Sequence, residues 1–311
     1  MKVLVSDPVS EEGIDMLRPH AQVDVKTGLT PEELISIIGD YDALVVRSQT
    51  KVTAKVIEAG KKLKVIGRAG VGVDNIDVDQ ATRRGIVVVN APKANTVSAA
   101  EHTIALMFCL ARYIPQAYAV LKSGVWRRAD FMGTEVSNKI LGIIGLGNVG
   151  SEVARRAQGL AMKVIANDPF ISADYARERQ VELVPLEQLL KEADFITLHV
   201  TLTPQTKGLI GAKELAMVKP TVRIINCARG GVIDEEALAK AVKEGRVAGA
   251  AVDVFSIEPA TECVLFECDN IIVTPHLGAS TTEAQAVAAK DVAEQIIDVF
   301  NGRPAKYSVN I

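Results

Sequence analysis

The sequence predicts an α/β protein built from two doubly wound parallel-sheet domains. Short apolar runs, typical of buried strands, alternate with helical patterns along nearly all of the 311 residues. Such alternation is typical of βαβ units, in which a helix connects two parallel strands. One compact domain usually holds ~100–200 residues, so the length favours two domains.

The first series of elements fills the N-terminal part of the chain. Its expected strands are 2–6, 43–47, 64–67 and 86–90, and its expected helices are 10–17, 31–38 and 53–59. A long helical segment, 98–123, follows this series. We expect one long helix there.

The second series fills most of the remaining chain. Its expected strands are 139–144, 163–167, 195–198, 223–226, 249–252 and 271–273, and its expected helices are 186–191, 235–244 and 282–300. No flexible linker separates the two series. Because the long helices 98–123 and 282–300 flank the second series, we expect the chain to leave the first domain, build the second and return. Residues 1–95 and 284–311 would form a discontinuous domain around the domain of residues 96–283.

The composition argues against nucleic acid and membrane as binding partners. Hydrophobic residues make up 48% and charged residues 23%, and the net charge of -3 offers no basic surface for nucleic acid. No stretch has the ~18 apolar residues of a membrane span, and no signal peptide is recognised. Four cysteines without a CxxC pair indicate free thiols in a reducing compartment. We expect a cytoplasmic protein that binds neither nucleic acid nor membrane.

A glycine loop marks the start of the second sheet. Gly145, Gly147 and Gly150 form a GxGxxG pattern between the strand 139–144 and a helical run. These glycines permit a tight turn, close approach of a pyrophosphate and close packing of helix on strand. Asp168 ends the next strand, where a carboxylate can accept from ribose hydroxyls and repel a 2′-phosphate. The pattern predicts NAD rather than NADP, although Asp168 could instead be an ordinary helix cap.

Three polar side chains follow later strands of the same sheet. Arg229 precedes two glycines, and a guanidinium can hold a 2-oxo acid carboxylate in a bidentate fork. His276 can exchange a proton near neutral pH, and Glu258, presented before Pro259, can fix its tautomer. Taken alone, each has an ordinary alternative: a surface salt bridge, a solvated loop carboxylate and a structural histidine. No His, Cys or acidic residues have metal-ligand spacing, so no metal is expected.

Many further motifs are spread along the chain. They lie at 47–53, 67–75, 90–92, 98–101, 126, 131–134, 145–150, 226–231, 253–255, 258–259 and 275–280. Together these motifs resemble the D-2-hydroxyacid dehydrogenases over essentially the whole chain, and most closely the phosphoglycerate-oxidising branch of that family. The resemblance implies a Rossmann-like nucleotide domain inserted in a flavodoxin-like substrate domain.

The resemblance also implies roles for individual residues. Arg229 would anchor the substrate, His276 would be the acid/base and Glu258 its partner. The positions matching cofactor contacts are Gly145, Gly147, Asn148, Val149, Gly150, Asp168, Cys227, Ala228, Asp253 and Gly278. The positions matching substrate contacts are Arg47, Ser48, Gly70, Val71, Gly72 and Arg229, with Arg68 and Arg128 as further candidates for a substrate phosphate.

The reaction that this resemblance implies is oxidation of 3-phospho-D-glycerate to 3-phosphohydroxypyruvate with NAD, for serine synthesis. The alternatives are a hydroxypyruvate or glyoxylate reductase, another D-2-hydroxyacid dehydrogenase, and, more remotely, an NAD(H)-sensing corepressor. A homodimer or higher homo-oligomer is expected through the nucleotide domain, with 100–117 as the apolar surface. Val71 departs from relatives that carry a hydroxyl there. Because the sequence stops at Ile311, before the C-terminal regulatory domains of many relatives, we expect no serine feedback through such domains.

Overall fold

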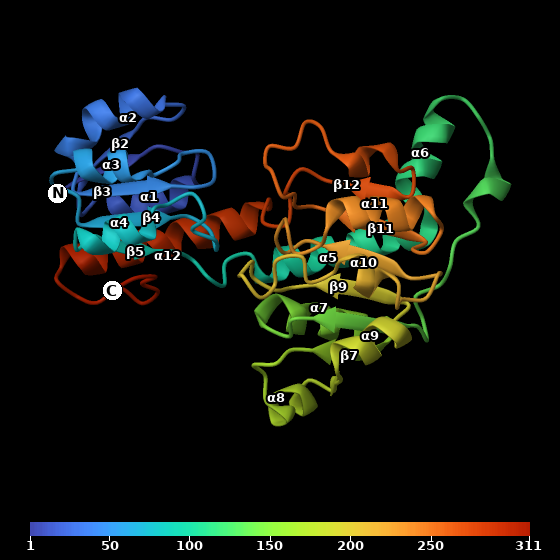
Figure 1. Ribbon diagram of the computed structural model, residues 1–311. Helices are drawn as coiled ribbons and strands as arrows, with labels where there is room; N and C mark the ends of the chain where they lie inside the picture. The colour runs from blue at the N-terminus through green and yellow to red at the C-terminus, as the bar shows by residue number, and fades with distance from the viewer. The chain divides into compact units, whose positions relative to one another are not determined.

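The computed structural model describes residues 1–311 and contains two compact units. The first unit comprises Met1–Asn95 and Ala279–Ile311, and the second comprises Thr96–Gly278. Each is built on one sheet whose strands all pair in parallel (Figure 1). The predicted fold class, two doubly wound α/β domains, is confirmed.

The first unit has a five-stranded sheet in the order β2-β1-β3-β4-β5, which is the flavodoxin-like order. Its strands are β1 (Lys2–Val5), β2 (Gln22–Val25), β3 (Ala43–Val46), β4 (Val65–Arg68) and β5 (Val87–Val89). The central strands β1, β3 and β4 are apolar except for Lys2 and Arg68 at strand ends, because both faces of the sheet are covered. Along β1, for example, Val3 and Val5 belong to one core cluster and Leu4 belongs to the other.

Two layers of helices cover this sheet. One layer is α2 (Pro31–Ile37), α3 (Ala54–Ala59) and α4 (Val78–Arg83), with the 3-10 helix η1 (Ile38–Asp40), and it shares a core with Leu4. The other is α1 (Glu11–Leu17) with α12 (Thr282–Phe300), which shares a core with Val3 and Val5. The chain thus returns to its first sheet through its last helix.

The second unit has a seven-stranded sheet in the order β12-β11-β10-β9-β6-β7-β8. Its strands are β6 (Ile140–Ile144), β7 (Lys163–Asn167), β8 (Glu182–Leu183), β9 (Phe195–Leu198), β10 (Arg223–Asn226), β11 (Gly249–Val252) and β12 (Ile271–Val273). The strand order reverses between β6 and β9. In open α/β sheets, ligands bind beyond the carboxyl ends of the strands at such a reversal.

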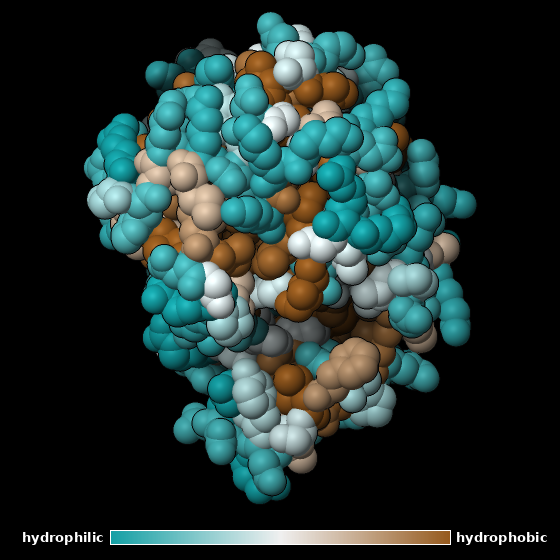
Figure 2. Space-filling model, turned by 90° about the vertical axis from the view of Figure 1, so that its left-hand side faces the viewer, coloured by the Kyte–Doolittle hydropathy of each residue, from teal (hydrophilic) through white to brown (hydrophobic).

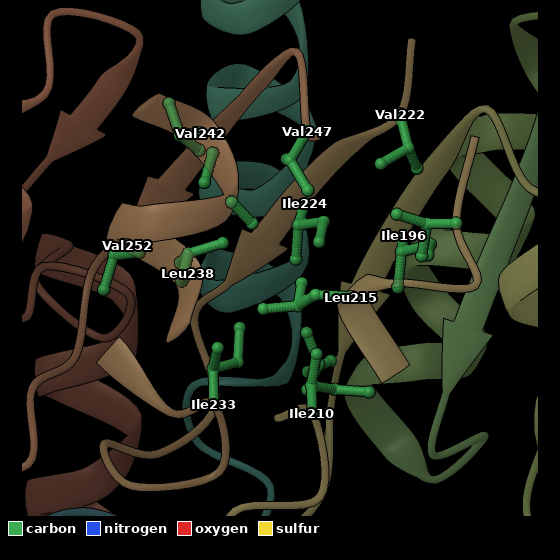
Figure 3. Packing of buried hydrophobic residues seen from close by; sticks show 14 of the residues in the cluster. Ile196, Ile210, Leu215, Val222, Ile224, Ile233, Leu238, Val242, Val247 and Val252 are labelled. Atoms are coloured by element: carbon green, nitrogen blue, oxygen red, sulfur yellow. The ribbon is translucent and has the colours of Figure 1, made fainter. Parts of the chain in front are cut away.

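Both faces of this sheet are also covered. The helices α9 (Leu186–Glu192), α10 (Ala212–Leu215) and α11 (Glu235–Lys243) pack on one face, where Ile196, Ile224 and Leu238 join one buried cluster (Figure 3). The helices α5 (Thr96–Arg112), α7 (Asn148–Gly159) and α8 (Ala173–Glu178) contribute to a second cluster on the other face. The strand ends are thereby held in fixed positions.

The expected continuous helix 98–123 is wrong. The structure has α5 and then α6 (Ile114–Lys122), with a bend of 63° between them. Tyr113 adopts a left-handed conformation with φ 54°, and Pro115 has no N–H to continue the helical ladder. No single helix has the length and apolar character of a membrane span; only α5 and α6 taken together meet that criterion. On the face drawn in Figure 2, hydrophilic side chains predominate around smaller hydrophobic areas.

Candidate active site

The glycine loop joins β6 to α7 at the reversal of the strand order. A Cβ added at Gly150 would lie 2.1 Å from the Gly145 carbonyl oxygen, and one at Gly145 would lie 2.6 Å from the His199 carbonyl oxygen. A Cβ at Gly147 would meet nothing within 4 Å. The loop is therefore tightly packed at both ends and open at its centre, in front of the N-terminus of α7. Free N–H groups and the helix dipole suit that space to a pyrophosphate.

Asp168 is bound to this loop. Its Oδ2 accepts the Leu146 N–H at 2.8 Å, and its Oδ1 accepts the Phe170 N–H at 2.9 Å. The next helix, α8, is capped instead by Ser172, whose hydroxyl accepts from the Tyr175 N–H. The alternative interpretation of Asp168 as a helix cap is therefore wrong, and its carboxylate lies beside the candidate phosphate site.

The loop after β10 carries Arg229. The buried Asn226 shapes it, because Oδ1 accepts the Ala228 N–H and Nδ2 donates to the Arg229 carbonyl, both at 3.0 Å. A Cβ added at Gly230 would lie 1.8 Å from the Phe255 carbonyl oxygen. The Arg229 loop and the loop after β11 thus touch backbone to backbone.

The loops after β11 and β12 bring Glu258 and His276 together. Glu258 Oε2 lies 2.7 Å from His276 Nδ1, and Glu258 Oε1 accepts the Phe255 N–H at 3.0 Å. Burial opposes ionisation of Glu258, but the hydrogen bonds from His276 and Phe255 outweigh it and hold its pKa below the ordinary value. An ionised carboxylate only accepts, so the proton lies on Nδ1 and Nε2 is the free acceptor of a neutral imidazole.

Asp253, fully buried at the end of β11, organises the backbone around His276. Its Oδ1 accepts the Thr274 hydroxyl at 2.5 Å and the Leu277 N–H at 2.8 Å, and its Oδ2 accepts the Gly278 N–H at 2.8 Å. Its carbonyl accepts the His276 N–H at 2.8 Å. Although burial opposes ionisation, hydrogen bonds from His102, Thr274 and the two amides keep the pKa of Asp253 lowered.

The structure also brings together three potential metal-ligating groups that the sequence spacing did not reveal. Ligand atoms of His102, Cys227 and Asp253 all lie within 4.8 Å of one another. Burial, reinforced by the charge of Asp253, raises the pKa of the Cys227 thiol to about 12. Hydrogen bonds already engage both carboxylate oxygens of Asp253. This cluster is therefore accounted for as a hydrogen-bond network.

His199 lies at the end of β9, behind the glycine loop. Its ring Nε2 lies 2.9 Å from the Thr197 hydroxyl oxygen, and its backbone N–H donates to the Ile144 carbonyl. Burial lowers the pKa of His199 to about 3. The imidazole is therefore uncharged at neutral pH.

In the first unit, two loops at the ends of neighbouring strands carry the candidate substrate residues. Arg47 and Ser48 follow β3, and the buried Asp7 accepts the Arg47 N–H at 2.6 Å and the Thr50 hydroxyl at 2.6 Å. Asn75 donates its Nδ2 to the Arg47 carbonyl at 2.9 Å. The sequence did not single out Asp7 or the role of Asn75, because each acts only through a contact distant in sequence.

The second of these loops, Gly70–Val71–Gly72, follows β4. The Gly70 carbonyl accepts the Ala91 N–H at 2.9 Å, and the Val71 carbonyl accepts from Asn90 Nδ2. A Cβ added at Gly70 would lie 1.8 Å from an Arg68 guanidinium nitrogen. Arg68 thus packs over the loop. Arg128, the other phosphate candidate, lies in the exposed 3-10 helix η2 (Arg128–Phe131).

Comparison with known proteins identifies the family. Residues 104–278 match the model of the D-isomer specific 2-hydroxyacid dehydrogenase, NAD binding domain. The chain belongs to this family. It is 58% identical over 310 residues to a D-3-phosphoglycerate dehydrogenase of Synechocystis sp. and 54% identical over 312 residues to one of Methanocaldococcus jannaschii. Both alignments cover 100% of this chain, which spans only 56% and 60% of those relatives.

A solved structure of a protein from Thermus thermophilus superposes with a TM-score of 0.92 at 32% identity. The match covers 99% of this chain and 100% of that one. The family assignment agrees with the open glycine loop, because the matched domain binds NAD. The superposition also extends the similarity to the first unit, which the family model does not cover.

Proposed function

We propose that this dehydrogenase oxidises 3-phospho-D-glycerate to 3-phosphohydroxypyruvate with NAD and so serves serine synthesis. The observation that carries the proposal is the His276–Glu258 pair, joined at 2.7 Å on strand ends of the sheet that also carries the glycine loop. The choice of substrate follows the names of the relatives that are 58% and 54% identical.

The proposed cofactor site uses the glycine loop. Gly145, Gly147 and Gly150, with the N–H groups of Asn148 and Val149, would hold the pyrophosphate, and Asp168 would accept from the ribose hydroxyls. The remaining contacts would come from Cys227, Ala228, Asp253 and Gly278. When bound, NAD accepts the hydride that leaves C2 of the substrate.

The chain's own side chains handle the proton and the carboxylate. His276 Nε2 takes the C2 hydroxyl proton, and Glu258 stabilises the imidazolium that forms. Arg229 holds the substrate carboxylate as a bidentate pair and so fixes the orientation of C2. Arg47, Ser48 and the loop Gly70–Gly72 bind the substrate as well, with Arg68 and Arg128 as the candidates for its phosphate.

We also propose a homodimer, formed through α6 and the segment that follows it. The structure corrects the expected apolar surface, because Leu106, Met107 and Leu110 of α5 are buried within the second unit. By contrast, α6 buries none of its residues. Exposed apolar side chains lie on α6 and on the segment after it: Ile114, Tyr118 and Leu121, then Val125, Trp126 and Met132. We infer that these side chains face the partner copy, because large exposed apolar areas mark interaction sites. The four free cysteines favour a reducing, cytoplasmic compartment.

A substrate panel tests the proposal. The purified chain is assayed with NAD and NADP against 3-phosphoglycerate, D-glycerate and D-lactate, and in reverse against phosphohydroxypyruvate, hydroxypyruvate and glyoxylate. The proposal expects the highest kcat/KM for the phosphorylated pair with NAD. A preference for glyoxylate or unphosphorylated hydroxypyruvate would reject the substrate assignment, and light scattering that shows a monomer would reject the dimer.

A further inference from the structure

His102 is a partly exposed polar residue of α5 whose ring reaches the ends of two strands of the sheet. Its helix neighbours Leu106, Met107 and Leu110 pack in the core of the second unit, whereas the His102 side chain remains 20% exposed. Its Nε2 lies 3.2 Å from Asp253 Oδ1 and 3.2 Å from Thr274 Oγ1. One ring nitrogen thus reaches residues at the ends of both β11 and β12.

The direction of these hydrogen bonds follows from the partners. The Asp253 carboxylate is ionised and only accepts, so His102 Nε2 must carry the proton. The Thr274 hydroxyl donates its own proton to Asp253 Oδ1 at 2.5 Å, which leaves its oxygen lone pairs to accept. His102 is therefore a donor to both groups and its presence completes the set of donors around Oδ1.

Asp253 in turn holds the backbone that carries His276. Its carboxylate accepts the N–H groups of Leu277 and Gly278, and its carbonyl accepts that of His276. His276 has φ 55°, a left-handed conformation that costs roughly 1–2 kcal/mol in a residue other than glycine. Hydrogen bonds on both sides of His276 hold this conformation in place.

We propose that His102 is a positioning residue, which orients the Asp253 carboxylate and thereby sets the backbone from which His276 reaches Glu258. The inference rests on the proposed acid/base role of His276. It assigns His102 no contact with substrate. Its effect runs through hydrogen bonds from α5 to Asp253, and from Asp253 to the segment 276–278.

Two substitutions separate this role from simple packing. His102→Gln places an amide N–H at the position of Nε2, whereas the shorter His102→Asn reaches only the position of Nδ1. Because His102→Asn loses the hydrogen bond to the charged Asp253, we expect its kcat to fall about tenfold or more. The substrate KM should stay within about twofold of wild type. The Gln variant should keep kcat within about threefold of wild type.

A second measurement does not depend on catalysis. Amide hydrogen exchange of Leu277 and Gly278, measured by NMR on the full chain without cofactor, should accelerate about tenfold in His102→Asn and remain near wild type in His102→Gln. Equal exchange in the two variants, or a fall in kcat of His102→Asn without faster exchange at Leu277 and Gly278, would overturn the proposal. If the wild type turned over no acid of the panel, the proposed function would fail, and the exchange contrast would still decide the role of His102.

Discussion

Substituting Gly230 by alanine tests whether backbone contact between two loops sets the geometry of the site. The added Cβ would lie 1.8 Å from the Phe255 carbonyl oxygen, 2.0 Å from its carbonyl carbon and 2.6 Å from the Ser256 nitrogen. All three are backbone atoms, so no side-chain rotation relieves the overlap. The loop that carries Arg229 and the loop that carries Glu258 must move apart.

The structure sets the size of this movement. Ordinary van der Waals contact begins at 3.4 Å, so the contact at 1.8 Å requires a separation of about 1.6 Å. A misplacement of about 1 Å can lower a catalytic rate about 10²-fold, and overpacking costs about 1–3 kcal/mol of stability. We therefore expect Gly230→Ala to lose at least about 10²-fold in kcat/KM while the protein remains folded.

The assay is steady-state turnover of the best acid of the substrate panel, with thermal unfolding measured in parallel. Gly159→Ala is the matched control, because a Cβ at this last residue of α7 meets nothing within 4 Å. The control should keep wild-type activity and stability. If Gly230→Ala retained activity within about threefold of wild type, the argument that the two loops are held by backbone contact would be refuted.

Two further predictions concern proton positions. In Glu258→Gln, the amide can donate to His276 Nδ1 and so force the proton onto Nε2, which removes the base. We expect kcat to fall about 10²-fold or more in steady-state assays. An unchanged kcat would exclude the pair from the mechanism. Because burial raises the pKa of Cys227 to about 12, this thiol should resist iodoacetamide at pH 8 in the native protein and react after unfolding. Peptide mass spectrometry would measure both states, and rapid native labelling of Cys227 would contradict the burial argument.

The sequence predicts the strands that lie inside the sheets better than those at the edges. The central strands are apolar on both faces, and the predicted strand at 195–198 agrees with β9 in both bounds. Of the four edge strands, β5 and β12 are predicted, whereas β2 and β8 are not. β2 includes Gln22 and Asp24 and buries none of its residues, and β8 has only two residues. Without burial on both faces, no apolar run marks these strands in the sequence.

The candidate site is predictable only in part, for a related reason. Gly145, Arg229 and His276 stand in local patterns, each within three residues of the end of an apolar strand. His102 lies in a helix, and Asp7 follows the predicted strand 2–6 without any sign in the sequence of what its side chain binds. His102 meets Asp253 across 151 positions of sequence and Asp7 meets Arg47 across 40. Asn226 had a usable clue, since it directly precedes the Arg229 turn and its amide can bond to backbone two or three residues later.

The order of strands in the second sheet explains how one edge can hold both the cofactor and the proposed acid/base pair. Read from β12 to β7, the strands end in His276, Asp253 with Glu258, Arg229, His199, the glycine loop and Asp168. Neighbouring strands lie about 4.8 Å apart, so the glycine loop is about 10 Å from the end of β10 and about 19 Å from the end of β12. An extended dinucleotide that starts at the glycine loop must therefore cross β9 to bring its reactive ring near Arg229 and His276. His199 ends that intervening strand, and because its pKa of about 3 keeps it uncharged, it places no cation beneath the path of the cofactor.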